Sequence, residues 1–185
     1  MTSYHQQVDA VLHELATALH SVDATALDTL CDAITGAPRI FVAGKGRSGL
    51  VMRAFAMRLM HLGLTAHVID EVTTPAVEAR DLLIIGSGSG ATPTLVRYAE
   101  RARALGARLA LLSAAPASPI AALADLLLVI AAASPKAAGT TPSIQPMANL
   151  FEQSLLLVVD IVTTRLMETR GLTTAAMMTR HANLE

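Results

Sequence analysis

The chain of 185 residues has little cysteine, few aromatic residues and few charges. Cys31 is its single cysteine, so no disulfide can form within the chain, which fits a reducing compartment. The composition of no Trp, two Tyr and three Phe leaves too few rings for a platform that stacks nucleic-acid bases. A formal net charge of −1 provides no polycationic surface. These deficits argue against a nucleic-acid-binding protein.

Long hydrophobic runs and a leader segment are also missing. The apolar stretches at residues 120–133 and 155–159 are too short for a bilayer span or are interrupted by an acidic residue. The first residues show neither the basic nor the apolar region of a secretory signal. We therefore expect a cytoplasmic protein without membrane contact. Because 52% of the residues are hydrophobic and only 16% are charged, we also expect an oligomer whose subunits cover each other's apolar helix surface.

Helical periodicity in the first part of the chain gives way to short apolar runs. Two amphipathic helices are expected at residues 4–20 and 23–35, the first capped by Ser3 and the second ended by Gly36. Five apolar runs are typical of buried strands: residues 39–43, 65–69, 81–85, 108–113 and 126–130. Further helices are expected at residues 48–61, 93–105, 119–123 and 147–169, with a short one in the tail at 173–185.

Continuous apolar strands that alternate with helices predict a parallel sheet covered on both faces. The expected fold is an α/β protein, a three-layer α/β/α sandwich with a five-stranded parallel sheet. We expect a single domain spanning 1–185, with N-terminal helices at 1–36, an α/β core at 37–131, and C-terminal helices and tail at 147–185. The intervening loop at 131–146 is rich in small residues and could act as a lid.

A small-residue turn follows the third expected strand. The sequence Gly86-Ser-Gly-Ser-Gly-Ala-Thr92 places three hydroxyls among three glycines, immediately before a helix. Glycines let backbone N–H groups approach an anion, and the N-terminus of the helix adds its positive dipole end. The same letters in isolation would describe a flexible turn. The strand before and the helix after favour a phosphate-binding loop.

The loop after the first strand allows a rival interpretation. The run from Gly44 to Gly49 fits the dinucleotide fingerprint G-x-G-x-x-G, and Asp70 and Glu71 stand where an acid could bind a ribose. However, the loop also carries polar groups suited to a small anionic sugar, and a second anion-binding loop is not required in a dinucleotide domain. Both loops follow strands of one sheet, where a single small ligand can touch both. We therefore favour a sugar phosphate.

The phosphate loop and five other segments resemble a known family. The phosphate loop is similar to the S-x-S-G-x-T motif of the sugar isomerase (SIS) superfamily. More narrowly, five segments resemble those of the 6-phospho-3-hexuloisomerases and follow in the same order. They are Gly46-Arg-Ser-Gly49, residues 55–63, Thr73-Thr-Pro75, Phe151-Glu152 and residues 180–184. The resemblance runs from about residue 39 to the end of the chain. Ala91 is a departure, because the familiar loop has Glu or Arg at this position.

The resemblance implies a flavodoxin-like SIS fold, a homotetramer, no cofactor and no metal. Its implied reaction interconverts D-arabino-hex-3-ulose 6-phosphate and fructose 6-phosphate in the ribulose monophosphate pathway of formaldehyde fixation. Sugar and phosphate would be bound by Gly46, Arg47, Ser48, Ser87, Gly88, Ser89, Gly90 and Thr92. Arg47 could equally be a surface arginine, and Ser48 could instead cap a helix. His13 and His20 on the first helix have no third ligand nearby, so we expect no metal site there.

Moving the carbonyl from C3 to C2 requires a base that takes the proton from C2 and returns one to C3 through an enediolate. Glu152 is the candidate base, although a carboxylate at a helix start is also favoured by the dipole alone. His181 and then His61 are candidates for moving a proton between the two oxygens. His61 could instead cap a helix end, and His181 lies in a polar tail. We hypothesise that this tail reaches the site of a neighbouring subunit.

Two alternatives remain open from the sequence. Another sugar-phosphate isomerase of the same superfamily would share the phosphate loop. A sugar-phosphate sensor without catalysis would share it too, but would have no need of Glu152 and His181.

Overall fold

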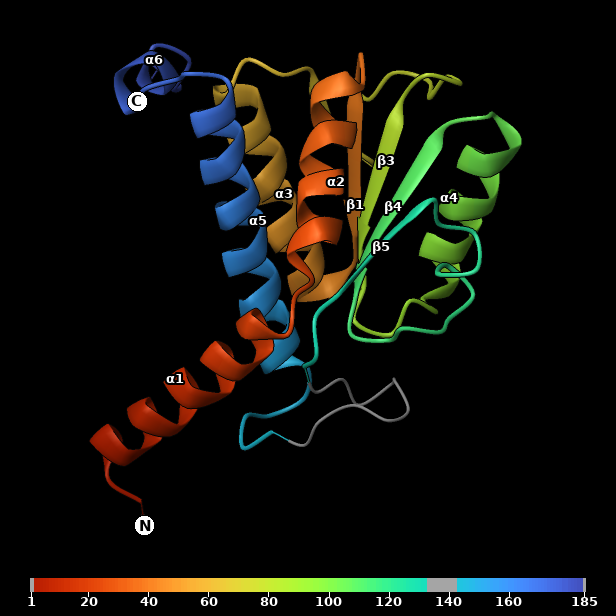
Figure 1. The fold of residues 1–185 in the computed structure, drawn as a ribbon. Coiled ribbons are helices and arrows are strands. Elements are labelled where there is room, and N and C mark those ends of the chain that lie inside the picture. Colours follow the sequence, from red (N-terminus) through yellow and green to blue (C-terminus); the bar gives the residue numbers. More distant parts are fainter. Residues whose placement is uncertain (1, 133–142, 185) are drawn as a thin grey trace.

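The computed structural model describes residues 2–132 and 143–184, and a parallel sheet forms their centre (Figure 1). Its strands are β1 (Ile40–Gly44), β2 (Ala66–Val68), β3 (Leu82–Gly86), β4 (Arg108–Ser113) and β5 (Leu126–Val129). They are ordered β2-β1-β3-β4-β5, and every neighbouring pair is parallel. All five expected strands are confirmed, with ends that shift by at most one residue.

Helices cover both faces of this sheet. They are α1 (Tyr4–His20), α2 (Ala24–Gly36), α3 (Gly46–His61), α4 (Pro93–Ala104), α5 (Asn149–Thr169) and α6 (Thr174–Met178). Figure 1 shows α2, α3 and α5 on one face and α4 on the other. Alternate strand residues accordingly divide between two buried clusters, with Val42 and Ile84 in the larger and Phe41 and Leu83 in the smaller. The three-layer sandwich is confirmed.

Local sequence signals fix several helix ends as expected. Ser3 caps α1 and forms a capping box with Gln6, while Asp23 caps α2 through its carboxylate. Pro93 occupies the first turn of α4, where its missing N–H costs nothing. The predicted helix at 119–123 is wrong: these residues form turns. Asp125 ends the segment between β4 and β5. Its carboxylate accepts a hydrogen bond from the backbone N–H of Leu109, which holds the start of β5 against β4.

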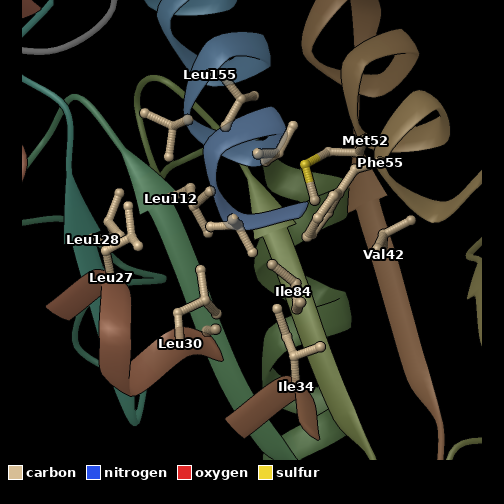
Figure 2. Packing of buried hydrophobic residues seen from close by; sticks show 14 of the residues in the cluster. Leu27, Leu30, Ile34, Val42, Met52, Phe55, Ile84, Leu112, Leu128 and Leu155 are labelled. Carbon is tan, nitrogen blue, oxygen red and sulfur yellow. The ribbon is translucent and has the colours of Figure 1, made fainter. Parts of the chain in front are cut away.

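The larger cluster joins the sheet to the three helices on its face. Figure 2 shows Leu30 and Ile34 of α2, and Met52 and Phe55 of α3, packing over the strands. Burying one such side chain contributes about 1.5–3 kcal/mol. This packing explains why apolar residues recur every three or four positions in these helices.

Two glycines allow α3 to start directly against the end of β1. A Cβ on Gly49 would lie 2.8 Å from the carbonyl oxygen of Gly44, and a Cβ on Gly44 would lie 2.9 Å from the Cα of Gly49. The fingerprint-like spacing of these residues is therefore required by helix–strand packing alone. No dinucleotide is needed to explain it.

The strand order creates a crevice between β1 and β3. From β1 the chain moves outward to β2 through α3, whereas from β3 it moves the other way to β4 through α4 on the opposite face. Gly44 and Gly86 end these two central strands in register. Ligands of doubly wound sheets bind at such a switch point, outside the carboxyl ends of the strands.

The expected loop at 131–146 falls mostly outside the described residues, because 133–142 are not described. Among the helices that the structure does describe, none is both long and apolar enough to span a bilayer.

Substituting Gly49 tests the packing of α3 on β1. Gly49→Ala should lower the free energy of unfolding by about 1–3 kcal/mol, because backbone atoms cannot move away as a flexible side chain can. Gly36→Ala is the matched control, since a Cβ there meets nothing within 4 Å. Chemical denaturation of both variants checks this. Equal stability of Gly49→Ala and the wild type would contradict it.

Candidate functional site

A cavity of about 460 Å³ opens at the switch point between β1 and β3. Three segments line it: the loop that leads into α3, the loop between β3 and α4, and the start of α5. The lining residues are Lys45, Gly46, Arg47, Ser48, Gly86, Ser87, Gly88, Ser89, Thr92, Leu95, Met147, Ala148, Asn149, Phe151 and Glu152. Its size suits a small phosphorylated sugar rather than a dinucleotide.

Close packing under the cavity floor depends on Gly86. A Cβ at this position would lie 2.7 Å from the sulfur of Met52 and 3.0 Å from a methyl group of Leu155. The absence of a side chain at the end of β3 therefore lets α3 and α5 approach the sheet together. Glu152 lies one turn before Leu155 on α5, and this approach brings it to the cavity.

The loop between β3 and α4 has the geometry of an anion-binding turn. Gly90 adopts a left-handed conformation with φ +58°, which turns the chain toward α4, and its N–H donates to the carbonyl of Ser87. Thr92 is the N-cap of α4 but makes no side-chain capping bond, so its hydroxyl is available to a ligand. The first N–H groups of α4 have no partners inside the helix. Ser87, Ser89, Thr92 and the first turn of α4 thus line the same cavity.

Gly90 itself does not line the cavity. It is buried, and a Cβ there would lie 2.1 Å from the hydroxyl oxygen of Ser118. Its contribution is to the shape of the loop. The other seven expected binding residues all line the cavity.

A guanidinium connects the first loop to the start of α5. Arg47 donates from Nε to the carboxylate of Glu152 at 3.0 Å, and its Nη1 donates to the side-chain oxygen of Asn149. The side chain of Glu152 is 15% exposed, whereas that of Arg47 is 56% exposed. A largely covered carboxylate therefore lies at the cavity next to a more exposed positive charge. Ser48 is the third residue of α3 and does not cap it, because Lys45 is the N-cap.

Lys45 is held beside the cavity by a second acidic group. Its ammonium donates to Asp70 at 2.5 Å and lies 5.5 Å from the centre of the Tyr98 ring, while the Tyr98 hydroxyl also donates to Asp70. The hydrogen bonds from Lys45 and then from Tyr98 lower the pKa of Asp70. Asp70 adopts φ +79°, in the left-handed region. The acid that could have bound a ribose is thus engaged in joining two loops of the fold.

The two candidate histidines lie together but far from this cavity. His61 is the last residue of α3 and is 4% exposed, and its ring stacks on that of His181 with centroids 5.5 Å apart. Burial, and then the charges of Arg58 and His181, lower the pKa of His61. Helix α3 has 16 residues, from Gly46 to His61, and a rise of about 1.5 Å per residue places its ends about 22 Å apart. Within one chain, the structure therefore separates both histidines from Glu152.

The tail reaches the histidine pair through Arg180. Its Nη1 donates to the backbone carbonyls of His61 at 3.4 Å and of Ala176 at 3.2 Å. The short helix α6, capped by Thr173, precedes it. Figure 1 shows α6 and the C-terminus at the end of the sheet opposite to the start of α5.

Asn149 is a polar residue of the cavity that the sequence analysis did not single out. It is the first residue of α5, three positions before Glu152, and its side chain binds Arg47. The sequence signal that could have identified it was its position one helical turn before the candidate base, Glu152. Met147, with φ +57°, completes this wall.

Comparison with known proteins identifies the family. The SIS domain model matches residues 33–160. The chain belongs to the SIS domain family. Over 97% of its length it is 44% identical to a 3-hexulose-6-phosphate isomerase of Bacillus subtilis, 98% of which is covered. A 3-hexulose-6-phosphate isomerase of Mycobacterium gastri is 45% identical over 95% of the chain and 88% of the relative.

A solved structure supports the same placement within the SIS family. A hypothetical protein from Methanococcus jannaschii, for which a molecular function of 3-hexulose-6-phosphate isomerase was inferred, is 32% identical. The match covers 97% of this chain and 99% of that one, with a TM-score of 0.84. The predicted SIS fold is confirmed.

Replacing Asp70 by Asn tests the link between Lys45 and Tyr98. Asn tolerates the left-handed backbone, so the change removes the charge and leaves the conformation. Because the pKa of Asp70 is lowered in the folded protein, its carboxylate stabilises the fold above the unfolded pKa, and this is lost as the pH falls through the folded value. Asp70→Asn should therefore be less stable than the wild type at pH 7, and the difference should shrink as the pH falls below the usual carboxyl pKa of about 4 and through the folded value.

Urea unfolding across this pH range measures the difference. The control is Asp32→Asn, a change at an exposed carboxylate on α2. A stability difference for Asp70→Asn that stayed constant with pH would contradict the assignment.

Proposed function

We propose that this protein is a 3-hexulose-6-phosphate isomerase, which interconverts D-arabino-hex-3-ulose 6-phosphate and fructose 6-phosphate in the ribulose monophosphate pathway. The observation that carries the proposal is the meeting of the phosphate-type loop and Glu152 in one cavity at the switch point. Near full-length similarity to isomerases of this specificity supports it.

The phosphate group anchors the substrate at one side of the cavity. Ser87, Ser89 and Thr92, with the N–H groups at the start of α4, bind its oxygens. The chain of the open sugar then extends toward the first loop and α5, where Ser48 and the backbone of Gly46 bind hydroxyls. Binding energy from a phosphate remote from C2 and C3 serves to orient the reacting carbons.

Glu152 acts as the base that removes the proton at C2 and returns it to C3. One carboxylate on one side of the enediolate can do both, so no second acid is needed for the carbon-bound proton. Arg47 moves from the Glu152 carboxylate to the oxygens of the enediolate and stabilises their negative charge. Its greater exposure and its place at a loop–helix junction suit this exchange of partners.

His181 moves the proton between the two oxygens in the site of a neighbouring subunit, within a homotetramer. Its separation from Glu152 of the same chain supports this arrangement, since the two residues lie at opposite ends of α3, a helix about 22 Å long. His61 stacks behind it, and the lowered pKa of His61 favours the neutral ring that can accept a proton. Exposed apolar side chains on α3 and α5, such as Met57, Met60 and Ile161, provide surface for assembly.

A coupled assay that follows fructose 6-phosphate formed from hexulose 6-phosphate tests the activity and the base together. The wild type should convert this substrate faster than pentose or heptose phosphates. Glu152→Gln should lower kcat by about 10²- to 10⁴-fold, because a neutral amide of the same shape cannot accept the proton.

The control for this variant is Glu100→Gln, at an exposed carboxylate of α4. Wild-type turnover by Glu152→Gln would refute the base assignment. Faster turnover of a pentose phosphate by the wild type would instead assign another isomerase activity.

Mixed oligomers test the shared site. Subunits with Glu152→Gln and subunits with His181→Ala should each be weakly active alone. If Glu152 of one chain works with His181 of another, a one-to-one mixture should recover about a quarter of the wild-type activity, because about a quarter of the sites contain both native residues. Absence of recovery in mixed oligomers verified by mass spectrometry would exclude a shared site.

A further inference from the structure

The segment of residues 143–149, whose last three residues line the cavity, is held in place by a residue of α1. Met147, Ala148 and Asn149 line the cavity, and Asn149 binds the guanidinium that also binds Glu152. The position of this segment therefore sets the position of Arg47. None of these contacts explains what holds the segment itself.

The carboxylate of Glu14 holds it. One oxygen accepts from the backbone N–H of Ile144 at 2.7 Å, and the other accepts from the Ser143 hydroxyl at 2.8 Å and the Gln145 amide at 3.2 Å. Three consecutive residues thus donate to a single carboxylate some 130 positions earlier in the chain. Hydrogen bonds to an ionised acceptor are stronger than those between neutral groups.

The position of α1 makes this contact an anchor. Helix α1 packs against α5 and extends beyond the sheet near the start of α5 (Figure 1). Burial raises the pKa of Glu14, but the hydrogen bonds from Ile144, Ser143 and Gln145 outweigh it, and the net pKa is lowered. The carboxylate is therefore ionised at neutral pH, as three donors require.

The link from this anchor to Asn149 is short. Pro146 fixes one backbone angle after Gln145, and its carbonyl accepts from the N–H of Asn149 at 3.2 Å. The N–H of Glu152 then donates to the carbonyl of Ala148 at 3.0 Å. A displacement of residues 143–145 is thereby transmitted to both polar groups at the start of α5.

We propose that Glu14 is a positioning residue for the isomerase site: it fixes residues 143–145 on α1, so that Asn149 holds Arg47 beside Glu152. The proposal rests on the proposed function. It assigns α1 a role in the geometry of the site, although α1 does not line the cavity.

Kinetics of three single variants test it first. Glu14→Ala should lower kcat roughly tenfold, the effect of about 1.4 kcal/mol, and leave KM within about twofold, because the phosphate loop is untouched. Asp9→Ala removes an exposed carboxylate from the same helix and should leave both constants unchanged. Glu14→Gln should restore most of kcat, since the Ser143 hydroxyl and the Gln145 amide can reverse their hydrogen-bonding roles.

A double variant tests the path of the effect. If Glu14 acts through Asn149, Glu14→Ala combined with Asn149→Ala should be no slower than the slower single variant. Multiplicative losses would overturn the proposal, as would equal kcat values for Glu14→Ala and Asp9→Ala. A loss of kcat that Glu14→Gln does not reverse would overturn it as well.

A spectroscopic measurement separates this inference from the activity. The ¹H–¹⁵N signal of Arg47 Nε–H should shift in Glu14→Ala and Asn149→Ala but stay in place in Asp9→Ala. An unchanged signal in Glu14→Ala would refute the positioning role. Failure of the wild type to isomerise hexulose 6-phosphate would refute the proposed function and leave this signal as the test of Glu14.

Discussion

The close approach of helices to the ends of β1 and β3 is the constraint on which the site depends. Gly44 and Gly86 end these strands in register, and neither position has room for a side chain. At Gly44 the backbone of α3 fills the space, and at Gly86 Met52 and Leu155 fill it. Because α3 and α5 start so close to the sheet, groups at their first turns reach the phosphate loop. Residues with larger side chains at these two positions would separate the parts of the cavity.

Charge balance at the cavity follows from this packing. Arg47 and Glu152 lie on different helices whose N-termini meet above the strands, and their ion pair offsets the cost of covering a carboxylate. In the proposed mechanism, the more exposed guanidinium exchanges its carboxylate partner for the enediolate, so that positive charge lies where the reaction would develop negative charge.

The sequence predicted the parts of the site that lie close together in the chain. The phosphate loop could be found because Ser87, Ser89 and Thr92 are nearly adjacent and stand between a strand and a helix. Strand and helix positions followed from apolar periodicity, whereas the turns at 119–123 did not, since five residues cannot distinguish a helix from successive turns. Asn149 and Glu14 were missed because their contacts join segments that are distant in sequence. The position of Asn149 one turn before Glu152 was a local hint, whereas nothing in the sequence near Glu14 indicates its contacts.

The position of the histidines shows how helix geometry constrains a mechanism. Ser48 and His61 lie near opposite ends of α3, and a rise of about 1.5 Å per residue already separates them by about 20 Å. Glu152 belongs to the Ser48 end, and His181 stacks on His61 at the other. A reaction that uses both Glu152 and His181 must therefore bring the ends of two chains together. If a two-fold axis placed the histidine end of one copy over the cavity of the other, it would do the same in reverse, and one interface would complete two sites.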